Sequence, residues 1–169
     1  METTLVVMAA GVIVILYFAF YGNAVESEKV IYVDSITSHS EISAEVRASL
    51  RSLLHRRAFD FYAQRLRLNE RMKVGRYVLS EDESVIRVVR KLVLGEQTPV
   101  KLVVGEARTL PQLAGKLSKQ IAADSATLLR AMRNKQIRKE LGLIKDSTIS
   151  LFIPNTYEVY WGISPEKLM

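Results

Sequence analysis

The pattern of apolar and polar residues separates a short N-terminal run from a longer amphipathic body. Every residue from Leu5 to Gly22 is apolar or aromatic, and the only charge before position 26 is Glu2. A helix of these 18 residues nearly crosses a hydrocarbon core of ~30 Å. Tyr17 and Tyr21 fall near one end of the run, where interfacial aromatic residues are expected. The pattern therefore predicts a transmembrane anchor within residues 1–25, with residues 5–22 in the membrane.

Two other interpretations of this run remain open. A buried helix of a soluble protein has a similar composition, and so does the apolar part of a cleaved signal peptide. The signal-peptide interpretation is weakened because no Lys or Arg precedes the run and no small-x-small cleavage site follows it. The sequence gives little indication of which end of an anchor faces the cytoplasm. The positive-inside rule compares Lys and Arg on the two sides of a span, and the first basic residue of the chain is Lys29.

The segment after the run is predicted to contain two strands separated by helices. Val30–Val33 and Gly75–Leu79 are rich in β-branched and aromatic residues, which favour strands. Ser40 or Ser43 is placed to cap a helix between them. Helical spacing predicts one apolar face from Val46, Leu50, Leu53 and Leu54, and a second from Phe59, Tyr62, Ala63 and Leu66. The side opposite the second face carries Arg56, Arg57, Arg65 and Arg67.

A further helix is predicted after the second of these strands. Ser80 and Glu83 have the spacing of a capping box, and Gly95 is placed to end the helix. The predicted buried stripe consists of Val85, Val88, Val89 and Leu92.

The last third of the chain predicts another mixture of helices and strands. Thr98–Val104 and Ile149–Ile153 are predicted strands, the second ending at Pro154. Thr109 and Gln112 form a capping box with Pro111 in the first turn, and Asp124 or Ser125 caps the next helix. The first of these helices is predicted to bury Leu110, Leu113, Leu117 and Ile121. Ser164 and Pro165 mark a helix start close to Met169, so we expect this second domain to be incomplete in the chain.

Composition excludes several classes of protein. Of the 169 residues, 49% are hydrophobic and 25% are charged, which argues against intrinsic disorder. The absence of cysteine removes disulfides, zinc–thiolate sites and cysteine nucleophiles, and two histidines leave little for a metal site. The net charge of +6 suits an anionic lipid or polymer. Nucleic acid is not expected as a partner, because no recognition motif accompanies the basic residues, which are spread along the chain.

Three segments resemble the endolytic murein transglycosylase family, called MltG or YceG-like. Residues 75–104, GRYVLSEDESVIRVVRKLVLGEQTPVKLVV, resemble its LysM-like subdomain. The stretch RTLPQLAGKLSKQIAADSATLL resembles the helix that follows, and LFIPNTYEVYW at 151–161 is similar to the F-P-[DN]-T-Y segment beside the active site. QTPV together with FIPNTYE is similar to the branch found in Bacteroidetes-type bacteria.

The resemblance implies an α+β fold in three parts. These are the anchor at 1–25, a LysM-like subdomain at 26–98, and the N-terminal part of a catalytic domain at 99–169. The implied activity is cleavage between N-acetylmuramic acid and N-acetylglucosamine in nascent peptidoglycan, leaving 1,6-anhydro ends, with no cofactor or metal. The implied location is the inner membrane, in a single pass with the main body in the periplasm. Peptidoglycan synthases are implied partners.

The chain departs from the family's E-G-x-x-F-P-[DN]-T-Y pattern at the glutamate. Counting five residues back from Pro154 gives Ile149, which cannot transfer a proton, and Ser150 replaces the glycine. Glu158 is the nearest carboxyl in the segment and is our candidate acid, with an ordinary exposed or paired carboxylate as the alternative. Glu106 and Glu140 are weaker candidates.

The residues around Glu158 are candidates for binding the sugar. Tyr157, Tyr160 and Trp161 would form a stacking platform, although aromatic clusters more often pack in a core. Asn155 and Thr156 would donate hydrogen bonds to the saccharide, or else satisfy a turn after Pro154.

Three hypotheses about function follow. The first is a membrane-anchored lytic transglycosylase. The second is a non-catalytic, membrane-tethered glycan-binding or scaffold module, which the missing glutamate favours. The third is the older family label, aminodeoxychorismate lyase, against which the N-terminal run and the lack of a pyridoxal-binding lysine motif argue.

Overall fold

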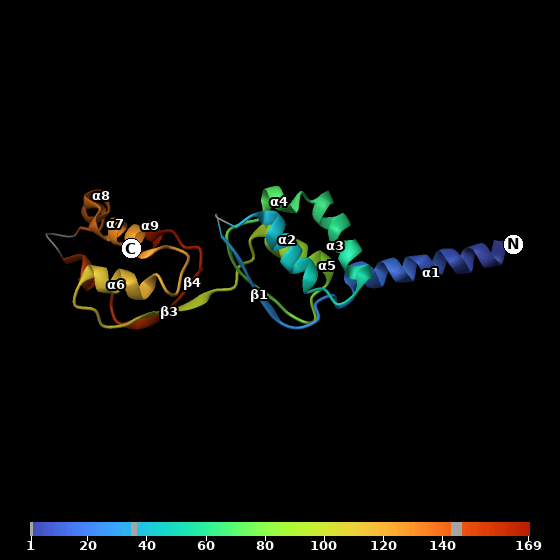
Figure 1. Cartoon of the computed structure of the whole chain (residues 1–169), viewed down its shortest axis with the longest axis horizontal. Coiled ribbons are helices and arrows are strands. Elements are labelled where there is room, and N and C mark those ends of the chain that lie inside the picture. Colours follow the sequence, from blue (N-terminus) through green and yellow to red (C-terminus); the bar gives the residue numbers. More distant parts are fainter. Residues whose placement is uncertain (1, 35–36, 143–146) are drawn as a thin grey trace. The chain divides into compact units, whose positions relative to one another are not determined.

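The computed structural model describes residues 2–34, 37–142 and 147–169. The chain forms two compact units, Met1–Gln97 and Thr98–Met169. Both contain helices and strands, which confirms the predicted mixed class (Figure 1). The LysM likeness of the first unit stays a prediction.

The N-terminal run forms one long helix, α1 (Glu2–Tyr21). Its mean hydropathy is 2.4, and among the described residues it is the helix long and apolar enough to cross a membrane. Nearly all of its side chains are exposed. Only its last turn packs on the rest of the unit, where Ala19 is buried and Phe20 is half-buried. Because solvent-exposed apolar side chains are unfavourable in water, this helix suits a lipid environment.

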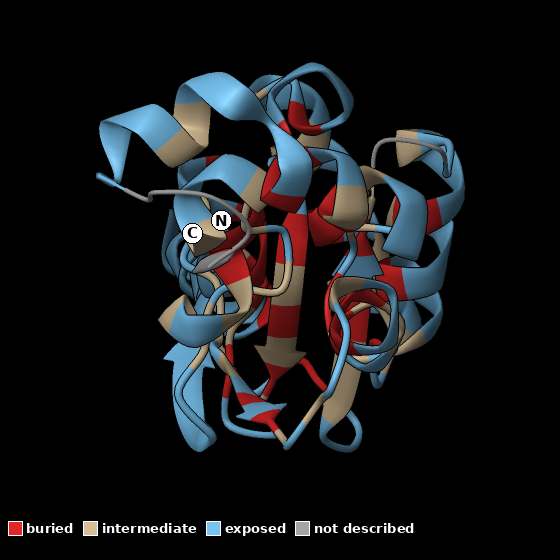
Figure 2. Cartoon of the chain, turned by 90° about the vertical axis from the view of Figure 1, so that its left-hand side faces the viewer, coloured by how far each residue is buried: buried red, intermediate tan, exposed pale blue. Residues whose placement is uncertain are grey.

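The first unit is built on a two-stranded antiparallel sheet, β1 (Lys29–Val33) and β2 (Gly75–Leu79). Lys29 pairs with Leu79 and Val33 pairs with Gly75. Burial alternates along β2, as expected for a strand with one face on a core, and such alternation is visible in Figure 2. The helices of the unit are α2 (His39–Ala48), α3 (Leu53–Arg65), α4 (Leu68–Arg71) and α5 (Val85–Leu94).

The predicted stripe of α5 is confirmed, but its predicted cap is wrong. Val85, Val88, Val89 and Leu92 are all fully buried, and Gly95 ends the helix with a φ of 77°. The helix begins one residue after Ser84, whose hydroxyl accepts from the backbone N–H of Arg87. Glu83 therefore lies before the helix, and its carboxylate is engaged elsewhere.

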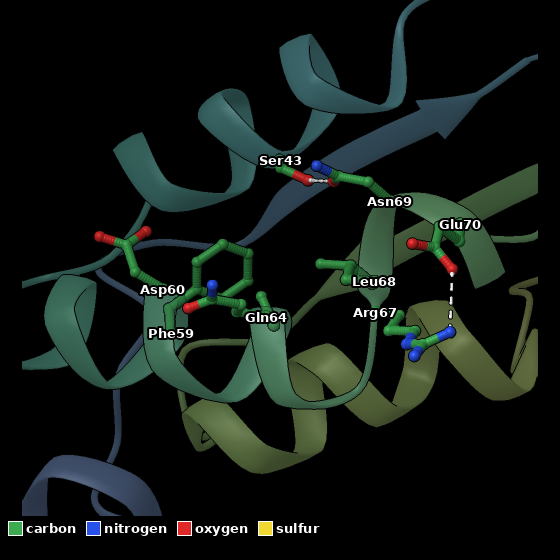
Figure 3. A pocket seen from close by; sticks show the side chains of 9 residues that line it. Ser43, Phe59, Asp60, Gln64, Arg67, Leu68, Asn69 and Glu70 are labelled. Atoms are coloured by element: carbon green, nitrogen blue, oxygen red, sulfur yellow. Dashed lines mark hydrogen bonds and ion pairs between the residues drawn. The ribbon is translucent and has the colours of Figure 1, made fainter.

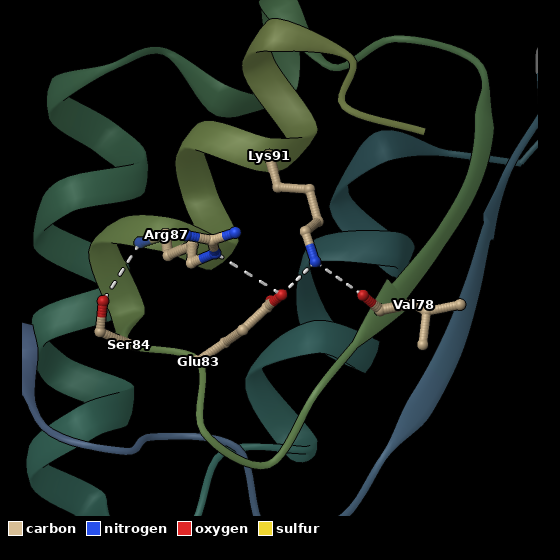
Figure 4. Close-up of polar contacts among 5 residues, drawn as sticks. All are labelled: Val78, Glu83, Ser84, Arg87 and Lys91. Carbon is tan, nitrogen blue, oxygen red and sulfur yellow. Dashed lines mark hydrogen bonds and ion pairs between the residues drawn. The ribbon is translucent and has the colours of Figure 1, made fainter. Parts of the chain in front are cut away.

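Glu83 and Lys91 form a buried ion pair beneath α5 (Figure 4). The ammonium of Lys91 donates to a carboxylate oxygen of Glu83 and to the carbonyl of Val78, the latter at 2.8 Å. Arg87 lies 3.9 Å from the same carboxylate. The pair therefore ties α5 to β2 and to the turn between them.

The chain breaks into two helices where the sequence predicted one continuous apolar face. Val46 and Leu50 are buried as expected, but α2 ends at Ala48. Ser52 then caps α3, accepting from the backbone N–H of His55. The break leaves Leu53 and Leu54 exposed, so they do not continue the apolar face of Val46 and Leu50 as predicted. The predicted caps Ser40 and Ser43 are also wrong, because α2 already begins at His39.

The second unit pairs β3 (Val100–Val104) with β4 (Asn155–Val159) in an antiparallel sheet. Between these strands lie α6 (Leu110–Leu117), α7 (Ser125–Arg133), α8 (Lys135–Glu140) and the 3-10 helix η1 (Ser147–Leu151). The short α9 (Pro165–Leu168) follows β4. The caps Thr109, Asp124 and Ser164 are confirmed, each accepting from a backbone N–H three residues on. Leu113 and Leu117 of α6 are buried as predicted, but Leu110 is only half-buried. Ile121 is also buried, but it lies after the end of α6 and not on that helix as predicted.

The strand predicted at Ile149–Ile153 is wrong. Residues 147–151 form η1, and the strand lies after Pro154. Ile149 packs on the core of the unit from a helical turn instead of pairing in a sheet. The β-forming residues Thr156, Tyr157 and Val159 supply the strand. Proline lacks the N–H that a ladder needs, so it marks the start of this strand.

We expect Lys91→Met to destabilise the protein by about 3–5 kcal/mol, because it leaves the Glu83 carboxylate buried without its cation. The double variant Lys91→Met with Glu83→Leu removes both charges and should recover most of that loss. Urea unfolding in detergent measures both. Equal losses in the single and double variants would contradict a role for charge burial.

A second prediction concerns alkaline pH. Burial raises the pKa of Tyr77 to about 12 from 10.0, and its hydroxyl donates to the carbonyl of Lys73. The unfolded state therefore loses this proton first, so stability falls as pH rises from 10.0 to about 12. The melting temperature of Tyr77→Phe should decline less across this range than that of the parent. Parallel declines would contradict the assignment.

Candidate functional site

The sheet of the second unit carries most of the residues that the sequence singled out. Asn155, Thr156, Tyr157 and Glu158 all belong to β4, and they pair in order with Val104, Val103, Leu102 and Lys101 of β3. Tyr160 and Trp161 follow directly. The structure therefore gathers the predicted segment on one edge strand next to β3.

The pleat of the sheet divides these residues between two faces. Residues directly opposite in an antiparallel pair share a face. Asn155 and Tyr157 thus lie on the face of Val104 and Leu102, which are buried against the core. Thr156 and Glu158 lie on the other face, where Glu158 is opposite Lys101. All four are exposed, so they are accessible to a ligand but do not converge on one point.

A pocket of about 260 Å³ lies at this sheet. Its walls are mainly apolar, and its lining residues also include Tyr157, Glu158 and Lys167. Glu158 contributes from β4, where its side chain lies on the opposite face of the sheet from Tyr157. The apolar lining residues are Leu102, Val104, Leu151, Phe152, Val159, Ile163, Leu168 and Met169. Concave apolar pockets with few polar groups are typical of small-molecule sites. Lys167 was missed from sequence, because nothing local indicates that α9 folds back to β4.

Ile149 lines a different pocket, of about 310 Å³. Glu106 and Arg108, from the loop between β3 and α6, line the same pocket. The backbone carbonyl of Glu106 accepts from the ammonium of Lys116 at 2.6 Å, which holds this loop against α6. The structure therefore brings a carboxyl residue close to the position where the family pattern has its glutamate. Glu140, on α8, lines neither of these pockets.

The three aromatic residues of the predicted platform have different environments. The hydroxyl of Tyr157 donates to the carbonyl of Ile153 at 3.0 Å, which closes the turn at Pro154. Tyr160 is 55% exposed. Trp161 is half-buried, and its carbonyl accepts from the N–H of Ala122. Tyr160 is thus the member most available for stacking on a sugar.

The first unit has its own pocket, of about 380 Å³, between α2, α3 and α4 (Figure 3). Ser43 donates to the side-chain oxygen of Asn69 at 2.6 Å across it. Arg67, with a left-handed φ of 52°, turns the chain from α3 into α4 and lies 3.8 Å from Glu70. The sequence placed Ser43 at a cap and Arg67 on a solvated face, so this pocket was missed. Among the described residues, no cluster of three His, Asp or Glu side chains forms a metal site.

The structure defines a mixed helix–strand protein with one apolar N-terminal helix and two small units. The sequence model of the YceG-like family matches residues 31–169. The match covers most of the chain, and the protein therefore belongs to the YceG-like family.

One solved structure that the chain resembles is the crystal structure of a yceG-like protein from Listeria monocytogenes. The two sequences are 22% identical, and the TM-score is 0.44. The alignment covers 84% of this chain and 51% of the Listeria chain, so this chain spans about half of that protein's length. A search of curated proteins finds no match.

Replacing the two tyrosines separates structural from binding roles at β4. Tyr157→Phe should cost about 1 kcal/mol of unfolding free energy, because it removes the hydrogen bond to Ile153. Tyr160→Phe should change stability by less than about 0.5 kcal/mol, because its side chain is exposed. Urea unfolding compares the two. An equal loss in both variants would contradict the structural role of Tyr157.

Proposed function

We propose that the protein is a membrane-anchored lytic transglycosylase acting on nascent peptidoglycan. The observation that carries the proposal is membership of the YceG-like family over residues 31–169, a family known for MltG-type transglycosylases. In this proposal α1 crosses the inner membrane once and the two units lie in the periplasm, where the glycan strands and their synthases are found. The apolar surface of α1 supports the anchor.

The reaction requires one carboxyl in two roles. The acid first protonates the glycosidic oxygen between N-acetylmuramic acid and N-acetylglucosamine as the bond to the anomeric carbon breaks. The resulting carboxylate then accepts the proton of the muramic acid 6-hydroxyl as that oxygen bonds to the same carbon. The substrate supplies the nucleophile, so the second carboxylate of ordinary glycosidases is not needed. The product is a 1,6-anhydro end.

Glu158 is the acid in this proposal. Its support is that it is one of the residues lining the apolar pocket of the second unit and is exposed on β4, the strand that also carries the exposed Asn155 and Thr156. These two, with Tyr157, Tyr160 and Trp161, would bind the sugar. A bound strand covering the pocket would exclude water from the carboxyl, which strengthens electrostatic interactions there.

A second candidate function is glycan binding without chemistry. The observation that favours it is the environment of Ile149 and Glu158. Ile149, at the family's glutamate position, is apolar and packs on the core, and Glu158 is exposed opposite Lys101. In this alternative the same β4 residues hold a glycan strand at the membrane for partner enzymes.

The two functions are separated by incubating the full chain in detergent with uncrosslinked glycan strands and counting 1,6-anhydro ends by mass spectrometry. Glu158→Gln should lower the rate by about 100-fold or more, the usual contribution of a general acid. Glu166→Gln, on exposed α9, is the matched control and should keep the parental rate.

The other outcomes of this assay are equally decisive. A loss of activity in Glu106→Gln but not in Glu158→Gln would move the acid to the pocket at Ile149. If the parent chain binds glycan strands and releases no anhydro ends, the protein is a binding module. Tyr160→Ala should then weaken that binding.

A further inference from the structure

One face of α3 exposes large apolar side chains. Leu53, Leu54 and Phe61 are 74%, 41% and 64% exposed. A helix advances about 100° per residue, so residues 53, 57 and 61 form one row, with 54 and 65 beside it. Single exposed apolar residues are ordinary, but three on one helical face indicate a contact surface. We refer to Leu53, Leu54, Arg57, Phe61 and Arg65 as the α3 outer face.

This face is also cationic. Arg57 and Arg65 are exposed between and beside the apolar residues. The acid of the same helix, Asp60, is engaged by Arg47 of α2 at 3.0 Å, so it does not neutralise them. Apolar side chains alternating with arginines are the pattern of helices that lie in a membrane interface.

The outer face lies directly beside the end of the apolar run. The ring of Phe20, within the run at 5–22, is centred 6.2 Å from the ring of Phe61 and 6.4 Å from that of Tyr62. Figure 1 shows α3 next to the end of α1 and crossing its direction steeply. When α1 spans a bilayer, Phe61 therefore lies at the level where the membrane ends.

We propose that the outer face of α3 binds the surface of an anionic bilayer. Leu53, Leu54 and Phe61 enter the interfacial region, and Arg57 and Arg65 pair with acidic lipid headgroups. The proposal rests on the membrane anchor proposed above, and it adds a second lipid contact that fixes how the first unit is oriented at the membrane. The occupant is lipid because the face adjoins the apolar run and carries unneutralised positive charge.

The absence of cysteine allows a direct test, because any introduced cysteine is unique. Spin labels are placed at residues 53 and 61 on the outer face, at residue 13 within the apolar run, and at the exposed position 41 of α2. The full chain is reconstituted in vesicles of phosphatidylcholine with or without phosphatidylglycerol. Accessibility to oxygen, which concentrates in lipid, is compared with accessibility to a water-soluble nickel chelate.

In anionic vesicles, labels at 53 and 61 should favour oxygen as the label at 13 does, and the label at 41 should favour nickel. Arg57→Gln with Arg65→Gln should reduce the ratio of lipid-contacting to water-exposed states of the label at 61 by on the order of 30-fold, from about 1 kcal/mol for each arginine near an anionic surface. The matched pair Arg130→Gln with Arg133→Gln, on exposed positions of α7, removes the same charge and should have no effect.

Three results would overturn the proposal in distinguishable ways. If labels at 53 and 61 favour nickel while the label at 13 favours oxygen, the anchor stands and the α3 contact fails. If they are shielded from both reagents, the face is covered by protein, such as a second copy of the chain. If the label at 13 favours nickel, the anchor itself fails, and the lipid contact fails with it.

Discussion

Both units depend on covering a small sheet with helices. In the described part of the chain, each unit contains a single pair of antiparallel strands of five residues each. A two-stranded sheet of this size is marginally stable in water, so one of its faces must be buried against helices. In the first unit α5 supplies much of that cover, and its valines and leucine are fully buried. In the second unit α6 has the same role through Leu113 and Leu117.

The two sheets meet this constraint to different degrees, and the difference bears on function. In β2 three of five residues are buried, whereas in β4 only Val159 is even half-buried. The buried ion pair of Glu83 and Lys91 also connects α5 to β2 in the first unit, in addition to the apolar contacts of its core. The first unit therefore has the rigid sheet, and the second presents an accessible strand. A strand with exposed polar side chains suits the binding of an extended polymer such as a glycan.

The α3 helix packs against both α5 and the apolar helix α1. Its inner side buries Ala58 and Phe59 in the core, and its outer side exposes leucines and arginines next to Phe20. A helix with two apolar sides is stable only where both find apolar surroundings. In the proposals made above, the lipid surface supplies the second, and α1 and the folded unit together contact the membrane.

Local patterns in the sequence determined the long apolar helix α1, strands β1 and β2, the buried stripe of α5 and the caps at Thr109, Asp124 and Ser164. Each of these features depends on residues close together in the sequence. Their spacing and side-chain chemistry are therefore sufficient to predict the local structure. Only the tertiary structure decided the break that exposes Leu53, the pairing of Glu83 with Lys91, and the strand after Pro154 in place of Ile149–Ile153. It also decided that Glu158 and Lys167 share a pocket and that Glu106 lies near Ile149. These features arise from contacts between segments far apart in sequence, and their energies depend on which side chains meet across the fold.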